Sequence, residues 1–206
     1  RQFIDQALTT RSDSLSNFNR KIAGKYKAGL GLRYLADYIG DSIISASFQE
    51  FYLKNNLKYA KSDDFKKIVS SKTTKDISWF FEDYLKTTKK IDYTIKKAII
   101  KDDSVYVTIK NKRNMTAPVA LYGLKNKQVK FKKWLTNIDS TKTIAIPKNG
   151  FNRVSLNFEN SYPEFNSMDN WKKVGKNILN KPIQFKLYKD INDPYYHQIY
   201  LQPNIK

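Results

Sequence analysis

The sequence contains no cysteine, so it can form neither a disulfide nor a metal site built on thiolates. It contains one histidine, His197, and one histidine cannot build the His-His-Glu site of a zinc peptidase. It also lacks any run of eighteen apolar residues that could cross a bilayer. Within these 206 residues, a disulfide scaffold and a complete zinc-peptidase site are therefore excluded.

Arginine is scarce although the chain is strongly basic. The net charge is +19, but only six of the 38 basic residues are arginine, whose planar guanidinium suits phosphates and guanine edges. The charge is also spread along the chain: residues 1–90 carry 17 − 10 = +7, residues 91–160 carry 14 − 5 = +9, and residues 161–206 carry 7 − 4 = +3. This distribution favours a solvated, lysine-rich surface and predicts no specific nucleic-acid site.

Residues 1–90 show helical periodicity, with apolar residues three or four positions apart. Asp41, Ser62 and Asp76 are predicted to begin helices, because short polar side chains accept hydrogen bonds from the first N–H groups of a helix. The side chains expected on the buried faces are Leu30, Tyr34, Leu35, Tyr38, Ile39, Ile43, Ile44, Phe48, Phe51, Tyr52, Phe65, Ile68, Val69, Ile77, Phe80, Phe81, Tyr84 and Leu85.

From Ile91 onward the period becomes two, which is typical of β-strands with one buried face. The sequence predicts six short strands separated by turn-forming residues, at residues 93–99, 105–109, 118–124, 129–135, 142–146 and 153–158. Strands at intervals of about ten residues are typical of a small sandwich. The predicted fold class is α+β: an incomplete helical bundle subdomain at 1–90, a small antiparallel β-sandwich at 91–160 and an extended C-terminal arm at 161–206.

Within the arm, the sequence predicts a loop from Ser161 to Asn170 and a short helix or irregular connector from Trp171 to Leu179. Ile183, Phe185 and Leu187 alternate as one more strand, and residues after Asp190 suggest an extended segment. Because this terminus is rich in aromatic residues, we expect it to pack on the sandwich or to lead into a further domain.

The segment Tyr26-Lys27-Ala28-Gly29, with the apolar helix face behind it, resembles a Tyr-x-x-Gly segment of the gluzincin zinc aminopeptidases, in which lysine is common where Ala28 stands. The resemblance continues in order through Lys72 to Phe81, with its capping Asp76 and aromatic-rich helix, and through Lys86 to Tyr93, which matches the exit into a β domain. The family's His-Glu-x-x-His helix is absent. The chain therefore resembles the C-terminal portion of such an enzyme, of the membrane alanyl aminopeptidase-like, bacterial envelope type.

The resemblance implies that Tyr26 donates a hydrogen bond to the oxyanion formed when zinc-activated water attacks a peptide carbonyl. It places zinc in the full-length parent and none in this chain, and it implies an N-terminal catalytic domain of the same polypeptide and a peptide substrate as partners. It also suggests a cell-envelope or periplasmic location and, downstream, a possible membrane-embedded domain. The isolated chain is expected to be inactive.

Two alternatives remain open from the residues themselves. Tyr26 is one of 14 tyrosines and could instead pack by its ring at a helix start. The chain could also be a non-enzymatic binding module that presents a lysine-rich sandwich face to an acidic partner such as nucleic acid or a lipid headgroup surface. The adjacent carboxylate pairs Asp63-Asp64, Glu82-Asp83 and Asp102-Asp103 have structural explanations in helix starts, polar faces and turns, so none predicts acid-base catalysis.

Overall fold

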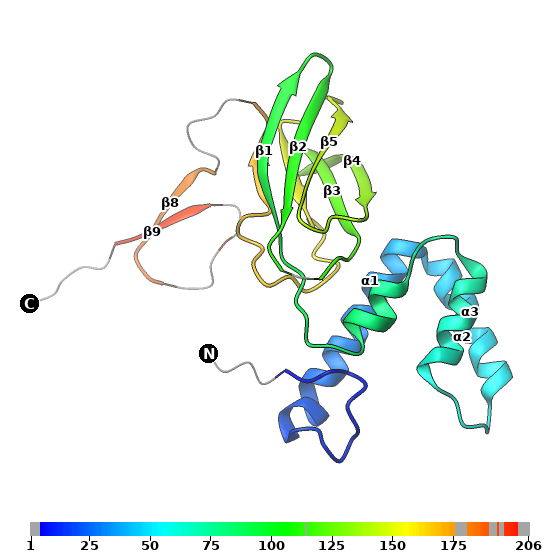
Figure 1. The fold of residues 1–206 in the computed structure, drawn as a ribbon. Coiled ribbons are helices and arrows are strands. Elements are labelled where there is room, and N and C mark those ends of the chain that lie inside the picture. Colours follow the sequence, from blue (N-terminus) through cyan, green and yellow to red (C-terminus); the bar gives the residue numbers. More distant parts are fainter. Residues whose placement is uncertain (1–4, 114, 176–180, 190–192, 194–195, 202–206) are drawn as a thin grey trace, which may run out of the picture. The chain divides into compact units, whose positions relative to one another are not determined.

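The computed structural model describes residues 5–113, 115–175, 181–189, 193 and 196–201. They form an α+β fold that divides into two compact units, shown along the chain in Figure 1. Unit 1 comprises residues 1–90 together with 160–163, and unit 2 comprises residues 91–159 together with 164–206. No helix among the described residues combines the length and the apolar character that a bilayer crossing requires.

Unit 1 is helical. A short π-helix, η1 (Asn19–Ala23), runs into α1 (Gly24–Ile39), and α2 (Asp41–Asn55), α3 (Ser62–Lys72) and a second π-helix, η2 (Trp79–Tyr84), follow. The break between α1 and α2 is made by Gly40, whose φ of 117° is one that residues with a side chain rarely adopt.

The helix starts differ in detail from the prediction. The N-cap of α2 is Gly40 and not Asp41, and η2 begins at Trp79, three residues after Asp76. The N-cap of α3 is Lys61 and not Ser62, because the Asp64 carboxylate accepts a hydrogen bond from the Lys61 backbone N–H at 3.0 Å. Asp76 still has a local role, since its carboxylate accepts a hydrogen bond from the Ser78 N–H.

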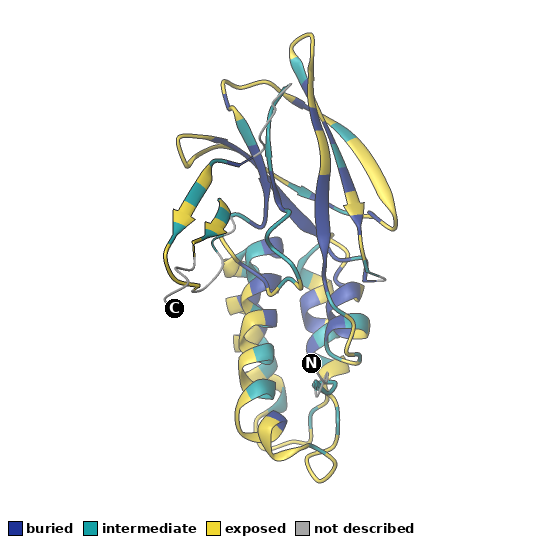
Figure 2. Cartoon of the chain, turned by 90° about the vertical axis from the view of Figure 1, so that its left-hand side faces the viewer, coloured by how far each residue is buried: buried dark blue, intermediate teal, exposed yellow. Residues whose placement is uncertain are grey.

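The core of unit 1 is aromatic. The Tyr34 ring lies 4.4 Å from the rings of both Trp79 and Tyr162, so the short segment 160–163 completes this core from far along the sequence. The predicted buried faces are confirmed for most positions. Leu30, Phe48 and Tyr52 are exceptions, since each is exposed: unit 1 covers only one side of α1 and of α2, a pattern visible in Figure 2.

Unit 2 contains two antiparallel sheets. The first has the order β1-β2-β5, with β1 (Tyr93–Lys101), β2 (Ser104–Asn111) and β5 (Thr141–Pro147). The second has the order β4-β3-β6-β7, with β3 (Val119–Lys125), β4 (Gln128–Leu135), β6 (Arg153–Leu156) and β7 (Trp171–Lys173). Strand β1 also contacts β6 and β7 of the second sheet.

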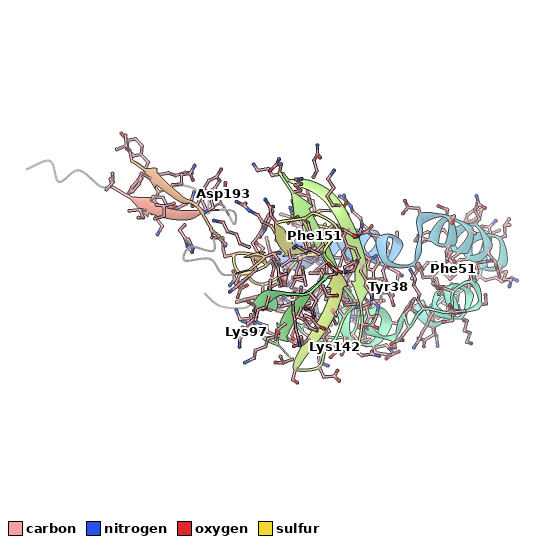
Figure 3. All side chains as sticks on the ribbon, turned by 90° about the horizontal axis from the view of Figure 1, so that it is seen from above. Tyr38, Phe51, Lys97, Lys142, Phe151 and Asp193 are labelled. Carbon is pink, nitrogen blue, oxygen red and sulfur yellow. The ribbon has the colours of Figure 1, made fainter. Side chains whose placement is uncertain are left out.

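The six strands that the alternating pattern predicts are all present. Val105, Val107 and Ile109 of β2 are buried on one face as expected, whereas β3 is buried on both faces along six successive residues. Phe151 packs so closely over Gly123 that a Cβ atom there would lie 2.5 Å from its ring. In Figure 3, Phe151 lies among the strands while Lys97 and Lys142, both exposed, extend from the sheet.

The last segment differs most from the prediction. Trp171–Lys173 forms the strand β7, paired with β6, where a short helix or irregular connector was expected, and residues 176–179 of that segment lie outside the described residues. The strand predicted at Ile183 is confirmed as β8 (Ile183–Lys186). Within the extended arm, β9 (His197–Tyr200) pairs with β8 in parallel.

Candidate functional site

Tyr26 lies in the first turn of α1, on the side of the helix that unit 1 leaves uncovered. Its side chain is 71% exposed, and it continues a row of exposed apolar side chains at four-residue spacing, formed by Phe18, Ile22 and Leu30. Residues four apart lie on the same helix face. The buried residues of α1 lie later along the helix, from Gly31 to Ile39, so the aromatic core leaves Tyr26 open.

The surroundings of Tyr26 are apolar and positively charged. An open hollow of about 660 Å³ is lined by Ile22, Leu30, Gly29 and Tyr26 itself, together with Lys21, Lys25 and Arg33. Among the described residues, the lining carries three cations and no carboxylate, and it is open above Gly29, where a Cβ atom would meet nothing within 4 Å. Such a surface can hold a ligand that places an anionic oxygen near the phenol, because a neutral phenol is a hydrogen-bond donor.

The backbone under Tyr26 is held firmly. The Tyr84 hydroxyl donates a hydrogen bond to the Lys27 carbonyl oxygen at 2.8 Å, and Lys27 Nζ donates to the Thr87 carbonyl oxygen at 3.3 Å. Gly31 lies against the Tyr84 ring, where a Cβ atom would be only 2.2 Å from the ring. The close neighbour of Gly31 is therefore η2 of the same unit.

The described residues contain no group of three or more His, Cys, Asp or Glu side chains that could hold a metal ion. The residues around Tyr26 thus do not fit a zinc ion, since those that line its hollow are lysines, an arginine and apolar groups. His197, the one histidine, lies exposed in β9 of unit 2.

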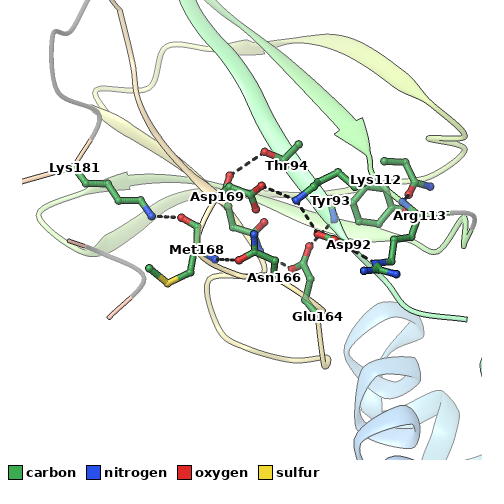
Figure 4. Close-up of polar contacts among 12 residues, drawn as sticks. Asp92, Tyr93, Thr94, Lys112, Arg113, Glu164, Asn166, Met168, Asp169 and Lys181 are labelled. Carbon is green, nitrogen blue, oxygen red and sulfur yellow. Dashed lines mark hydrogen bonds and ion pairs between the residues drawn. The ribbon is translucent and has the colours of Figure 1, made fainter. Parts of the chain in front are cut away.

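The sequence did not reveal a second cluster, which the fold assembles at the start of β1 (Figure 4). The Glu164 carboxylate accepts hydrogen bonds from the Tyr93 N–H at 2.8 Å and from Asn170 Nδ2 at 2.5 Å. Asp92 lies buried beside Arg113, at 3.5 Å from its Nε, and Lys112 Nζ lies 3.1 Å from the Asp169 carboxylate. The carboxylates come from positions 92, 164 and 169, so no local motif could have shown their convergence.

Burial determines the electrostatics of this cluster. Burial raises the pKa of Glu164 to about 7, although the hydrogen bonds from Tyr93 and Asn170 oppose that shift. Burial also raises the pKa of Asp92, against the opposing charge of Lys112. The Oδ1 atom of Asn170 is buried without a partner among the described residues, so turning that amide over would let Oδ1 accept a hydrogen bond from the O–H of a neutral Glu164 carboxyl.

The contacts of this cluster give it a structural role, which is to hold one loop against a strand. Its contacts fix residues 164–170 against the beginning of β1, and Phe165 N–H adds a backbone hydrogen bond to the Ile91 carbonyl oxygen at 2.9 Å. The Arg113 guanidinium also lies 3.7 Å from the centre of the Phe165 ring. The adjacent carboxylate pairs singled out in the sequence do not belong to this cluster. In one of those pairs, the Glu82 carboxylate accepts hydrogen bonds from Lys66 and Lys86, and these hydrogen bonds lower the pKa of Glu82 to about 2.

No family model matches this chain, and no curated protein sequence matches it either. Among solved structures, the chain is similar to aminopeptidase A of Legionella pneumophila, determined in complex with aspartic acid. The similarity has a TM-score of 0.60 at 17% sequence identity and covers 71% of this chain but 18% of that chain. The chain thus spans less than a fifth of the length of that aminopeptidase, and the likeness shows a similarity in fold alone.

Proposed function

We propose that this chain is the C-terminal portion of a zinc aminopeptidase of the gluzincin type, and that Tyr26 serves its active site. The observation that carries the proposal is the position of Tyr26: a firmly supported α1 holds its phenol in the open, at the rim of a positively charged hollow. The similarity in fold to part of an aminopeptidase supports the same assignment. The metal ligands and the catalytic domain would belong to the rest of the parent polypeptide.

The role of Tyr26 follows from the chemistry of a phenol. When a nucleophile attacks a peptide carbonyl, negative charge develops on the carbonyl oxygen, and a donor already aimed at that oxygen stabilises the transition state. A phenol remains a neutral donor at pH 7. Lys21, Lys25 and Arg33 around the hollow add a positive field that favours the same charge.

The test uses the full-length parent. Replacing Tyr26 with Phe retains the ring and removes only the hydroxyl, so we expect turnover to fall on the order of a hundredfold to a thousandfold, with little change in substrate affinity or stability. Steady-state kinetics on aminoacyl reporter substrates measure both parameters. Tyr52→Phe is the matched control, because Tyr52 is another exposed tyrosine, 66% exposed on α2. Full activity of Tyr26→Phe in an active parent would show that Tyr26 has no catalytic role.

A second experiment tests the isolated chain. Because its described residues hold no group of three metal ligands, we expect it to bind no stoichiometric zinc and to hydrolyse no aminoacyl substrate. Elemental analysis after dialysis against a weak chelator measures the first, and a long incubation with reporter substrates measures the second. One zinc per chain that survives dialysis would refute the placement of the metal site outside this chain.

A binding module is the second candidate, favoured by the outward face of β4. Lys130, Lys132 and Trp134 alternate along that strand, and Lys132 Nζ lies 5.3 Å from the centre of the Tyr122 ring and 5.9 Å from that of Trp134. Cations interleaved with aromatic rings suit an acidic partner. An upstream sequence of the parent without His-Glu-x-x-His and a second Glu would favour this candidate over the peptidase.

A further inference from the structure

Unit 2 contains a partly enclosed cavity of about 220 Å³ that has no part in the proposed peptidase. It is lined by residues from five segments: Asn126 and Lys127, Asn152 and Arg153, Trp171, Pro182, and Tyr196. The fold brings these segments together at one end of the second sheet, where the turn from β3 to β4 lies close to the start of β6. Asn126 and Lys127 are both left-handed, with φ of 50° and 65°, as a tight hairpin turn requires.

The register of the sheet explains how the cavity acquires its groups. Arg153 pairs with Leu124 of β3 on one side and with Lys173 of β7 on the other, and Trp171 pairs with Ser155 two residues along. Residues two apart on a strand share a face, so Arg153 and the β7 residue Trp171 lie on the same face of the sheet. The Asn152 N–H donates to the Leu124 carbonyl oxygen at 3.0 Å, which fixes the backbone just before Arg153.

The residues that line the cavity combine positively charged groups, which suit an anion, with flat apolar side chains. The described lining residues carry two cations, Lys127 and Arg153, and no carboxylate. The half-buried Arg153 guanidinium makes no hydrogen bond or ion pair with the other described residues, so its planar fork is available to a ligand. The amides of Asn126 and Asn152 add polar groups, while Tyr196, Pro182 and the edge of the largely buried Trp171 supply apolar surface.

We propose that this cavity binds a small organic carboxylate with a flat apolar body. The guanidinium of Arg153 would receive the carboxylate in two parallel hydrogen bonds, and the body would lie against Tyr196 and Trp171. The size and partial enclosure of the cavity exclude a duplex nucleic acid, whose backbone needs an open, extended positive surface. The carboxylate could belong to a free small molecule or to the C-terminus of a peptide, and the two sources share the same recognition chemistry.

The test is an NMR titration of the complete 206-residue chain in about 150 mM salt, which screens diffuse surface charge. Benzoate represents a free carboxylate and N-acetylphenylalanine a peptide end, while benzamide and N-acetylphenylalaninamide are their neutral counterparts. We expect the carboxylates to bind with Kd of the order of 1 mM and to shift the Trp171 indole signal. The Trp79 indole, in unit 1, should not move. The tighter of the two carboxylates then identifies the source.

Two substitutions link the binding to Arg153. Arg153→Gln should weaken carboxylate binding about tenfold or more, since a charged hydrogen-bond partner is lost. Arg153→Lys should lie in between, because it retains the charge but loses the fork. Arg20→Gln, on an exposed residue of η1, is the matched control and should bind as the original chain does.

Three outcomes would overturn the proposal. The first is equal binding of the amides and the carboxylates, and the second is equal or tighter binding of inorganic phosphate. The third is a shifted Trp171 signal that persists in Arg153→Gln. In that case the ligand occupies the more open hollow on the other side of Trp171, which is lined by Lys172, Lys181 and Asp169 among others. None of these outcomes bears on Tyr26, which lies in unit 1, so the peptidase proposal is tested separately.

Discussion

At the scale of single residues, Glu164 is the carboxyl group whose pKa folding raises most. Its carboxyl has an ordinary pKa of 4.5, and burial in the folded chain raises that pKa to about 7. The folded state therefore binds more protons than the unfolded state between these two values. The stability contributed by the protonated carboxyl is fully present below about pH 4.5 and is lost as the pH rises through about 7.

We therefore expect the free energy of unfolding to fall by roughly 2 to 3 kcal/mol, from this group alone, between about pH 4.5 and 7. Glu164→Gln, which stays neutral, should flatten that part of the profile. Urea unfolding at several pH values measures it, with Asp103→Asn in the exposed turn before β2 as the control. A profile of equal slope in Glu164→Gln would show that the Glu164 carboxyl does not take up a proton on folding.

Much about individual residues of α1 could be predicted from sequence, and little about Glu164. Helical spacing alone assigns Tyr34, Leu35, Tyr38 and Ile39 to the buried face, whereas the exposure of Tyr26 is known only from the structure. The pKa of Glu164 depends instead on Tyr93, 71 positions earlier, and on the burial that their pairing creates. The raised pKa of Glu164 can therefore be known only from the folded structure, because nothing in the sequence around Glu164 or around Tyr93 indicates that the two residues pair.

At the scale of elements, the packing of α1 on η2 depends on Gly31. A Cβ atom at this position would lie 2.2 Å from the Tyr84 ring, whose hydroxyl is already committed to the Lys27 carbonyl oxygen. The ring cannot move away without losing that hydrogen bond. The two helices therefore approach each other at a distance that only glycine permits.

We expect Gly31→Ala to destabilise the chain by about 1 to 3 kcal/mol, the usual cost of overpacking a core. Gly29→Ala, two residues earlier on the open face, should be neutral or stabilising by up to about 1 kcal/mol, since alanine favours a helix over glycine. Denaturant midpoints of both variants measure the difference. Equal midpoints would mean that α1 and η2 separate easily at Tyr84.

The strands could be predicted better than the helix starts. The alternation of apolar and polar residues predicts the ends of a strand to within a residue or two, as in β2 and β4, because a shift by one residue would turn the apolar face of the strand outward. Helix α3 begins at Ser62 as predicted, but its N-cap is the preceding residue, Lys61, and only the hydrogen bond from the Lys61 N–H to Asp64 decides between the two. Strand β7 was missed because Trp171–Lys173 is too short to show a period.

At the scale of the whole molecule, the charge of +19 is distributed over both units. Several lysines are already engaged by carboxylates, as Lys132 is by Glu159 at 2.6 Å and Lys72 by Glu50 at 2.6 Å. A diffuse field of this kind attracts polyanions without selecting among sequences, because it contacts phosphates and not base edges.

We therefore expect the chain to bind duplex DNA weakly, without sequence preference, and to lose that binding between roughly 50 and 200 mM salt. Fluorescence anisotropy with two unrelated duplexes measures both properties. Submicromolar binding to one of them at physiological salt would instead establish the lysine-rich surface as a specific interface, and would favour the binding-module candidate.

The return of residues 160–163 to unit 1 has a consequence for how the protein is made. Tyr162 completes the stack on Tyr34, but the ribosome adds it 72 residues after Lys90, the last residue of the main helical segment. At typical synthesis rates of about 5–20 residues per second, unit 1 waits on the order of several seconds with one side of Tyr34 uncovered. The core of unit 1 is thus completed only after most of the β-rich unit has been translated. A gene fragment ending at Lys90 would encode the helices without Tyr162, whose ring covers Tyr34.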